Sequence, residues 1–393
     1  MRVLFLVPHP PEGASGRYRV LQYLPWLARH GITAEARPFM SETLYRMLYL
    51  PGHVPQKLLL ATGAVMRRLA DLVRAARADV VVVHREALPL GTALLERAIA
   101  RLSPALVFDF DDAIYLPHAL SANAWTQVFR NGAKTDTIIR LSAHVIAGNR
   151  VLEAYARRFH PRVSLLPTPV DTDHYRPRPA AAQRTRIVIG WIGSPTTANY
   201  LAPLQQPLAQ LLRRHPQLDI RIVGTTGAPL QLPNLRLMRW DLAREQEELH
   251  QFDIGVMPMP DDEWARGKCG FKALLYMSAG IPVVASPVGI NTEIVREGIN
   301  GFLASTPDEW ADRLGQLIED SALRERMGRS GRTIVEEEYS LRVSAPRLLR
   351  VLKDVGRRSR CDAVLIKRFT AFRRRISLQR CRELYYNSLM FRK

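Results

Sequence analysis

Short runs of apolar residues alternate with longer stretches of helical periodicity along most of this chain of 393 residues. The runs are continuous, as in Val80–Val83, and continuous runs are typical of strands that helices cover on both faces. Repetition of strand, helix and strand predicts open, largely parallel sheets of an α/β protein. A single core rarely grows beyond about 250–300 residues, so the length favours two such domains.

The predicted strands form two groups. The first group is Arg2–Val7, Ile32–Phe39, Asp79–Val83, Ala105–Phe110, His144–Ala147 and Val163–Leu166. The second group is Ile187–Trp191, Asp219–Val223, Arg236–Trp240, Asp253–Val256 and Pro282–Ala285. The predicted helices are Arg17–His30, Val65–Ala76, Asn149–Phe159, Tyr200–Arg214, Glu245–Gln251, Phe271–Ala279 and Thr292–Glu297. Each group can build one doubly wound sheet, so we expect two Rossmann-like domains.

A segment rich in proline and without periodicity, residues 166–182, separates the two groups. We therefore predict a first domain over residues 1–172 and a second domain over residues 173–340. A crossover helix is expected over residues 341–356, followed by a basic tail over residues 357–393. Ligands of such folds bind at the carboxyl ends of the strands, so we expect a site in the cleft between the domains.

The composition indicates a protein of a reducing compartment. Three cysteines cannot staple a chain of this size, and their odd number suggests free thiols. No apolar run approaches the roughly 20 residues that a membrane-spanning helix needs. The first strand is too short for the core of a signal peptide, so we expect a cytoplasmic protein without a leader.

The net charge of +19 is unevenly placed. Between Val355 and Lys393, twelve Lys or Arg residues stand against two acidic residues, which places about half of the excess in the tail. Aromatic and aliphatic residues interleave with these cations, as in interfacial segments on anionic membranes. We expect peripheral attachment to the inner face of the cell membrane, and a solvated tail is the alternative. Nucleic acid is not expected, because no binding motif accompanies the charge.

The most informative segment runs from Gly267 to Gly289. A glycine-containing loop leads into a short predicted helix, on which a spacing of four places Lys268, Lys272 and Tyr276 on one face. Cations at the start of a helix are disfavoured by its macrodipole unless an anion is bound there. We therefore predict an anion site at this helix, and two solvated surface lysines are the alternative.

This segment resembles the donor-binding loop of the GT-B glycosyltransferases of family 4. Gly270–Phe271 and Met277–Ala285 match the family pattern, whereas Lys268 and Tyr276 stand where the family has two glutamates. The resemblance covers roughly residues 1–355 and is most specific in the second half. It implies the GT-B fold and a retaining glycosyltransferase that moves a sugar from a nucleotide-diphosphate sugar to a glycan or lipid-linked acceptor in envelope polysaccharide synthesis. It implies no further cofactor and no obligatory metal.

The resemblance also assigns the donor site. Most relatives clamp the diphosphate with an Arg and a Lys after the first strand of the second domain, and this chain has neither in that loop. We predict that Lys268 and Lys272 replace the clamp, that Tyr276 hydrogen-bonds the ribose, and that Ser194 and Thr196 cap the following helix. The predicted donor-binding residues are Gly193, Ser194, Thr196, Gly224, Trp240, Lys268, Gly270, Phe271, Lys272 and Tyr276.

Polar residues also follow the predicted strands of the first domain. Asp109–Asp112 ends a strand, so its carboxylates are expected to project into the cleft. They could bind Mn²⁺ as an Asp-x-Asp site, or they could bind acceptor hydroxyls and steady positive charge on the sugar; we favour the second interpretation. The predicted catalytic residues are Asp111, Asp112 and Lys268. The predicted acceptor or phosphate residues are Gly16, Arg17, Arg19, His84 and Asp109.

Two other functions remain compatible with the sequence. A GT-B nucleotide-sugar epimerase would consume the donor without an acceptor. A non-catalytic protein could keep the fold only to bind a nucleotide sugar, and the replaced glutamates leave this alternative open.

Overall fold

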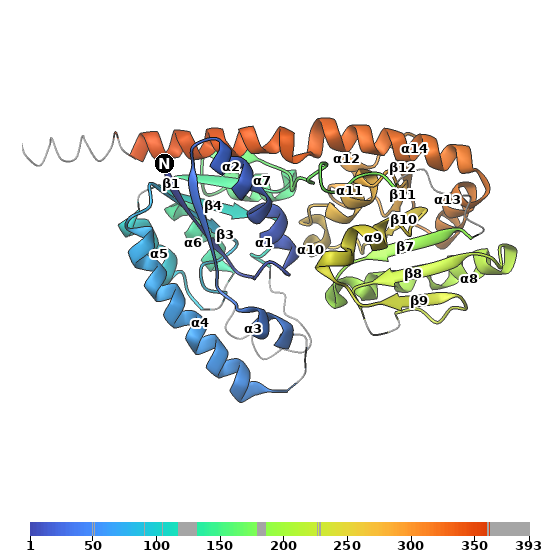
Figure 1. Ribbon diagram of the computed structural model, residues 1–393, viewed down its shortest axis with the longest axis horizontal. Helices are drawn as coiled ribbons and strands as arrows, with labels where there is room; N and C mark the ends of the chain where they lie inside the picture. Colours follow the sequence, from blue (N-terminus) through green and yellow to red (C-terminus); the bar gives the residue numbers. More distant parts are fainter. Residues whose placement is uncertain are drawn as a thin grey trace, which may run out of the picture.

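The structure is a computed structural model, which describes residues 1–48, 50, 52–89, 91–103, 105–116, 132–178, 186–225, 227, 229–359 and 361. Figure 1 shows two α/β domains side by side, with a helical stretch from α14 onward running along one edge of both. Each domain contains one six-stranded parallel sheet. The predicted fold class, two doubly wound domains, is confirmed.

The first sheet has the strand order β2-β1-β3-β4-β5-β6. Its strands are β1 (Arg2–Val7), β2 (Thr33–Pro38), β3 (Val80–His84), β4 (Leu106–Phe110), β5 (His144–Ala147) and β6 (Val163–Leu165). All pairs are parallel, and the residues of β3 and β4 are buried throughout. Burial of whole strands explains why their sequences are continuous apolar runs.

The second sheet has the order β12-β11-β10-β7-β8-β9. Its strands are β7 (Val188–Ile192), β8 (Asp219–Val223), β9 (Leu235–Met238), β10 (Ile254–Met257), β11 (Val283–Ala285) and β12 (Gly301–Leu303). The edge strand β12 was not predicted, because three residues are too short to show a period.

The helices of the first domain are α1 (Ala14–Arg19), η1 (Leu21–Tyr23), α2 (Leu24–Arg29), α3 (Glu42–Met47), α4 (Val54–Ala75), α5 (Leu94–Leu102), α6 (Ala133–Leu141) and α7 (Arg150–Arg157). Those of the second are η3 (Pro195–Leu204), α8 (Gln205–Arg214), η4 (Leu242–Arg244), α9 (Glu245–Leu249), α10 (Glu263–Arg266), α11 (Phe271–Ser278), α12 (Asn291–Ile294), α13 (Pro307–Glu319), α14 (Ser321–Ile334) and the π-helical η5 (Val335–Tyr339).

Several predicted helix bounds are wrong for local reasons. The single helix predicted over 17–30 is three pieces, because the backbone leaves helical geometry at Val20 and α2 restarts with a proline in its first turn. The helix predicted over 200–214 begins earlier as a 3₁₀ segment that contains Pro203. Helix α4 begins at Val54, eleven residues before its predicted start at Val65.

The chain returns to the first domain after η5. Ser340 forms a parallel bridge with Val170, and residues 341–359 are helical. Leu348 and Leu352 of this helix are buried in the core formed by β1 and its neighbours. The helix thereby holds both domains to one scaffold. Beyond it only Cys361 is described, so the predicted basic tail lies almost wholly outside the described residues.

Candidate functional site

The carboxyl ends of the two sheets meet at an interdomain site, formed by residues that follow β1, β3 and β4 and by residues of the loops after β7, β8 and α10. The Asn149 side chain donates to the carbonyls of Gly267 and Lys268, at 2.8 and 3.0 Å. The Cys269 thiol donates to the Asp111 carbonyl at 3.1 Å. The structure thus brings together the two segments that the sequence singled out, around Asp109–Asp112 and around Lys268–Lys272.

Asp109 is the central hydrogen-bond acceptor in the part of the site that the first domain contributes. Its carboxylate accepts hydrogen bonds from the Arg19 guanidinium and, at 2.7 Å, from Nδ1 of His84. All three residues are buried. Burial alone would raise the pKa of Asp109, but the Arg19 charge outweighs it and holds this pKa below its ordinary value. Arg19 also donates to the Leu166 carbonyl at 2.6 Å, so it is an internal partner of Asp109 and not a free cation for an acceptor.

Asp111 lies next to the second domain, because its backbone carbonyl accepts from the Cys269 thiol. Its carboxylate accepts from the Ser15 hydroxyl at 2.9 Å and from Nε of Arg85 at 2.7 Å. The Ser15 hydroxyl also lies 2.6 Å from Nε2 of His84, which links both carboxylates through one hydrogen-bond chain. Burial raises and the Arg85 charge lowers the pKa of Asp111, with a net decrease. Asp111 is therefore ionised and fully partnered.

Arg85 adopts a positive φ of 62°, which is uncommon for a residue with a side chain. This conformation directs its guanidinium between Asp111 and Asp112. Lys268 approaches the same Asp112 carboxylate from the second domain, with its Nζ 3.6 Å from Oδ1. Each of the three carboxylates is thus matched by a cation. Within the described ranges, no group of three or more His, Cys, Asp or Glu residues could hold a metal ion.

Two glycines bring the loops after β7 and β8 into contact. Gly224 has φ +103°, and a Cβ there would lie 1.8 Å from the Gly193 carbonyl oxygen. A Cβ on Gly193 would lie 2.5 Å from the Trp191 ring and 2.8 Å from Cε of Lys272. Only glycine fits at either position. The backbones of the Gly193 and Gly224 loops and the aliphatic part of the Lys272 side chain are therefore in close contact.

Lys272 is the second residue of α11 and is half-buried beside this glycine contact. Its Nζ lies 5.5 Å from the centre of the Trp191 ring. Burial, followed by repulsion from Lys268, lowers the pKa of Lys272 to about 7. Among the described residues its ammonium group makes no hydrogen bond or ion pair. A cation that is both desolvated and unpaired at a helix amino end is suited to bind an anion.

The expected shared face of Lys268, Lys272 and Tyr276 is not observed. Lys268 precedes α11, whose N-cap is Gly270 with φ +62°. Tyr276 is fully buried against Phe252, and its hydroxyl accepts from the Ile192 amide at 3.0 Å. The structure therefore places Tyr276 in the core of the second domain, with its hydroxyl occupied, and not where a ribose could reach it.

Three further predicted donor-site residues have partners within the protein. Ser194 precedes η3 but makes no capping bond, and its hydroxyl lies 2.6 Å from that of Thr196. The ring of Phe271 packs on that of Tyr18 in the first domain, with centroids 3.9 Å apart. In the first domain, a Cβ on Gly16 would lie 3.6 Å from the nearest atom, which is an ordinary contact. A Cβ on Gly13 would lie 2.4 Å from Cβ of His9 and would clash.

A buried carboxylate on α9 closes the other side of the domain contact. Glu245 accepts hydrogen bonds from Arg17 at 3.1 Å, from Tyr18 at 2.8 Å and from the Tyr175 hydroxyl. The indole N–H of Trp240 donates to the same carboxylate at 2.8 Å. Arg17 is thus held by Glu245 across the domains instead of facing the site as a free cation.

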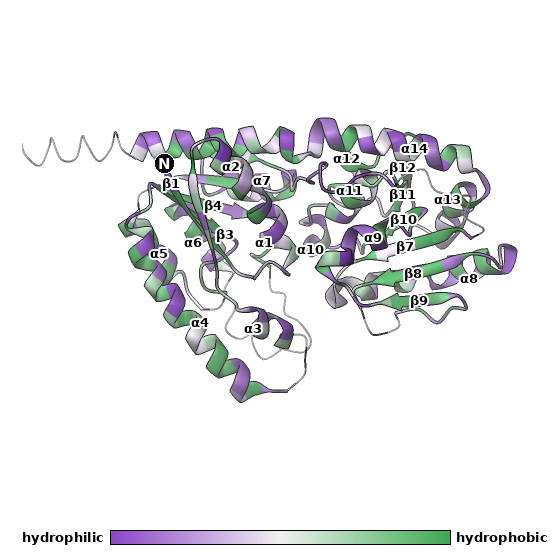
Figure 2. Cartoon of the chain, viewed as in Figure 1, coloured by the Kyte–Doolittle hydropathy of each residue, from purple (hydrophilic) through white to green (hydrophobic). Residues whose placement is uncertain are grey.

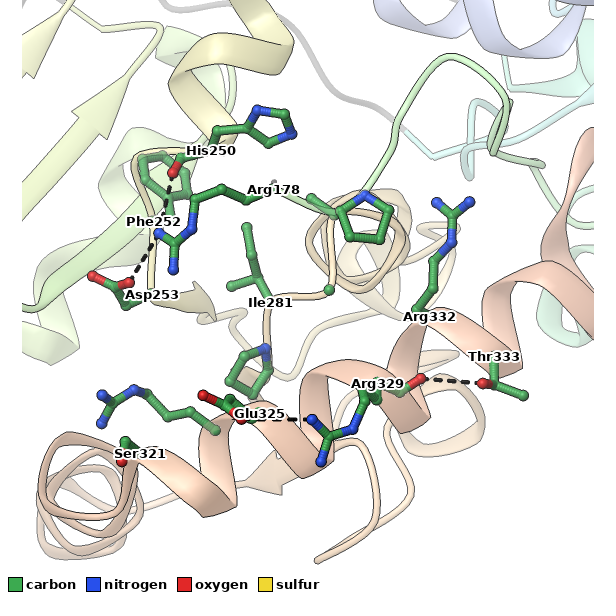
Figure 3. Close-up of a pocket in the computed structure, with 15 residues that line it drawn as sticks. Arg178, His250, Phe252, Asp253, Ile281, Ser321, Glu325, Arg329, Arg332 and Thr333 are labelled. Carbon is green, nitrogen blue, oxygen red and sulfur yellow. Dashed lines mark hydrogen bonds and ion pairs between the residues drawn. The ribbon is translucent and has the colours of Figure 1, made fainter. Parts of the chain in front are cut away.

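Figure 3 shows a separate cavity of about 480 Å³ on the second domain. Arg178, Arg329 and Arg332 line it, but each has a partner: Asp253, Glu325 and backbone carbonyls such as that of Ser278. These cations are already compensated, so this cavity is a poorer anion site than the surroundings of Lys272.

Sequence reasoning missed four residues of the site, namely Ser15, Arg85, Trp191 and Glu245. Ser15 and Arg85 are neighbours of the predicted residues Gly16 and His84. Both follow a predicted strand, and this position could have identified them as candidates. Glu245 gave no signal, because three of its four donors, Arg17, Tyr18 and Tyr175, come from distant segments of the chain.

The comparisons with known proteins concern the family of the second domain and the fold. Residues 186–320 match the family model of the glycosyl transferases group 1. The D-inositol 3-phosphate glycosyltransferase of Corynebacterium urealyticum is 31% identical over 157 residues, 35% of this chain and 36% of that protein. The enzyme of the same name from Nocardioides sp. is 30% identical over 207 residues, 42% of this chain and 43% of that protein. The chain thus matches less than half the length of these relatives.

Solved structures resemble the whole described fold. A sucrose-phosphate synthase from Thermosynechococcus elongatus has a TM-score of 0.67 at 16% identity, over 90% of this chain and 98% of that one. Anabaena HepE in complex with UDP and glucose has a TM-score of 0.63 at 16% identity, over 90% of this chain and 100% of that one. The chain therefore has the GT-B fold, and its second domain matches the group 1 glycosyl transferases.

Proposed function

We propose that the chain is a glycosyltransferase that moves a sugar from a nucleotide-diphosphate sugar to a glycan or lipid-linked acceptor. One observation carries the proposal: the Lys272 ammonium group, which has no hydrogen-bond or ion-pair partner in the described part of the chain, lies at the amino end of α11 against the closely packed Gly193 and Gly224 loops. This arrangement lies inside the segment that matches the group 1 family. A diphosphate at this point would gain a cation and the free N–H groups of the helix.

The charged residues of the site support different roles for the lysines and for Asp112. The leaving diphosphate would be stabilised by Lys272, and charge-assisted contacts of this kind are worth about 1.5–3 kcal/mol each. Asp112 faces the opposite domain and would contact the acceptor or the sugar. Lys268 shares Asp112 with Arg85, so it would position this carboxylate as well as approach the phosphate.

Retention of the anomeric configuration is part of the proposal. Asp109, Asp111 and Asp112 are each paired with a cation, and pairing weakens a carboxylate as a base. Deprotonation of the acceptor by the departing phosphate, on the same face of the sugar, needs no free protein base. This supports front-face displacement. Proton NMR of the product formed from an α-linked donor would show an α-linkage, and a β-linkage would contradict retention.

The proposed acceptor rests on the sequence of the C-terminal tail, which lies outside the matched second domain. The matched relatives are named for D-inositol 3-phosphate, but the family match covers the second domain only. The basic, aromatic-rich sequence of the tail favours an acceptor at an anionic membrane, as in synthesis of an envelope polysaccharide. Removal of residues 362–393 should shift the protein from the membrane fraction to the supernatant.

A release assay tests the proposal against its alternatives. The protein is incubated with UDP-, GDP- and ADP-sugars, with and without an extract of cell-envelope acceptors, and free nucleoside diphosphate is measured. A glycosyltransferase releases the diphosphate in proportion to the acceptor. An epimerase consumes the donor without an acceptor, and a binding protein shows donor affinity without release.

A further inference from the structure

Helix α4 buries charged residues against the protein and exposes large apolar residues to solvent. Lys57, Arg68 and Asp71 lie on its inner face beside Ala64 and Ala75 and are only 8%, 1% and 3% exposed. A helix on the surface of a globular domain normally buries its large apolar residues and exposes its charges. Figure 1 shows α4 extending beyond the first sheet at the outer side of this domain. Helix α4 departs from the usual pattern in both respects.

The inner face is nevertheless well satisfied. The Arg68 guanidinium donates to the carbonyls of Ala87 and Val7, each at 2.9 Å, and to that of Arg37 at 3.1 Å. It also pairs with Asp71 at 3.3 Å. A buried charge with four partners fixes the rotation of the helix. The exposure of the opposite side is therefore built into the fold.

That opposite side carries an apolar stripe, which we name the α4 face. Its members are Leu58 (64% exposed), Leu59 (73%), Met66 (62%), Leu69 (45%) and Val73 (56%). The steps between successive members are one, seven, three and four residues, so all five share one side of the helix, where Thr62 is an exposed polar residue between Leu59 and Met66. Figure 2 shows green hydrophobic bands that alternate with purple hydrophilic bands along α4. A solvent-exposed stripe of this length marks an interaction surface.

The exposed charges beside the α4 face are mostly positive, although Arg74 pairs with Asp71 and with the exposed Glu35 of β2. Helix α5 packs against α4 and adds the exposed Leu94. Five arginines on or next to these helices are exposed: Arg67, Arg74, Arg77, Arg97 and Arg101. The acidic residues within α4 and α5 are Asp71 and Glu96, and both are buried. The outer surface of the pair is thus apolar and cationic.

We propose that the α4 face is a docking surface for an anionic lipid bilayer. Apolar side chains flanked by arginines match the acyl boundary and the phosphate headgroups at once. None of the described helices has the length and hydropathy to cross a membrane, so the contact would be peripheral. A second copy fits less well, because self-pairing would place the same arginines opposite one another. The tail fits less well too, since residues 362–393 carry nine Lys or Arg against two acidic residues.

Co-sedimentation of the full-length chain with vesicles tests this proposal. The vesicles contain phosphatidylcholine alone or with phosphatidylglycerol, and no nucleotide sugar is present, so the result is independent of the proposed function. The wild-type chain should bind the vesicles that contain phosphatidylglycerol, and less so at high salt. The triple variant Leu58→Ser, Leu59→Ser, Met66→Ser should bind at least about tenfold more weakly, because three exposed apolar side chains are lost.

A matched variant controls for exposed apolar residues in general. Val151→Ser, Leu242→Ser, Ile299→Ser removes side chains that are 39%, 40% and 54% exposed elsewhere on the surface, and should leave vesicle binding unchanged. Hydrogen exchange of the wild-type chain gives a reading that needs no variant: vesicles should protect the amides of α4.

Three results would overturn the proposal. The first is equal vesicle binding by the α4 variant and the wild type, which would assign binding to another segment such as the tail. The second is unchanged exchange in α4 when vesicles are added. The third is self-association of the wild type without lipid that the α4 variant abolishes, which would identify a second copy as the occupant.

Discussion

The Tyr18 hydroxyl of the first domain donates a hydrogen bond of 2.8 Å to the Glu245 carboxylate of the second. Arg17 and Trp240 donate to the same carboxylate, so one acidic side chain joins the loop after β1 to the donor domain. This carboxylate therefore links the facing loops of the two domains beside the interdomain site.

Replacing Glu245 with alanine should open the domain contact. Its loss removes the ion pair of Arg17 and leaves the Trp240 indole N–H and one of the two buried tyrosine hydroxyls without their acceptor, which costs about 2–4 kcal/mol. Small-angle X-ray scattering should therefore give a larger radius of gyration than for the wild type. Glu247→Ala is the matched control. Glu247 is 73% exposed, and its ion pair with Nε of Arg244, at 3.7 Å, lies within the same segment and does not join the domains. A radius unchanged in both variants would contradict a closing role for Glu245.

Donor affinity should depend on pH through Lys272. The folded pKa of this lysine is about 7, so the group is cationic below that pH and loses its charge as the pH rises through it. Affinity for a nucleoside diphosphate should therefore weaken as the pH rises through this value, with a proton taken up on binding. Lys272→Met keeps the packing on Trp191 without the charge and should flatten this dependence. An equally steep profile in the methionine variant would assign the titration elsewhere.

The three aspartates should separate into structural and functional residues. Asp109→Asn leaves Arg19 buried without a charge partner and should destabilise the first domain by about 3–5 kcal/mol in urea unfolding. Asp112→Asn, at a site 18% exposed, should change unfolding by less than about 1 kcal/mol but lower kcat at least about 100-fold. Full activity of the Asp112 variant would remove this carboxylate from the reaction.

Tyr276→Phe tests whether this residue belongs to the core or to the donor site. Removing the hydroxyl leaves the buried Ile192 N–H unsatisfied, which should cost about 1–3 kcal/mol of unfolding free energy. The dissociation constant for the nucleotide sugar should stay unchanged. A tenfold loss of donor affinity at unchanged stability would instead support a contact with the ribose.

The sequence predicts the sheets well because their residues are buried on both faces. Strands β1, β5 and β8 have the predicted bounds, since each is an apolar run that ends at polar or turn residues. Asp109, His84 and Gly193 lie at the carboxyl ends of strands as expected, but Asp109 was expected to project into the cleft and is instead buried and bonded to His84 and Arg19.

The rotation of helices could not be read in the same way. Lys268 was expected on the face of Lys272 and Tyr276, but α11 begins only at Phe271, and the side of α11 that carries Tyr276 packs into the core. Helix α4 was predicted only from Val65, since its apolar residues point outward and its inner Arg68 is held by carbonyls of other segments. Such partners depend on tertiary contacts that no local pattern encodes.

A crystal structure with a bound nucleoside diphosphate tests the central claim most directly. The account predicts the terminal phosphate within hydrogen-bond distance of Lys272 Nζ, against the amino end of α11 and the Gly193 loop. A diphosphate bound in the arginine-lined cavity of Figure 3, with Lys272 left uncontacted, would contradict it.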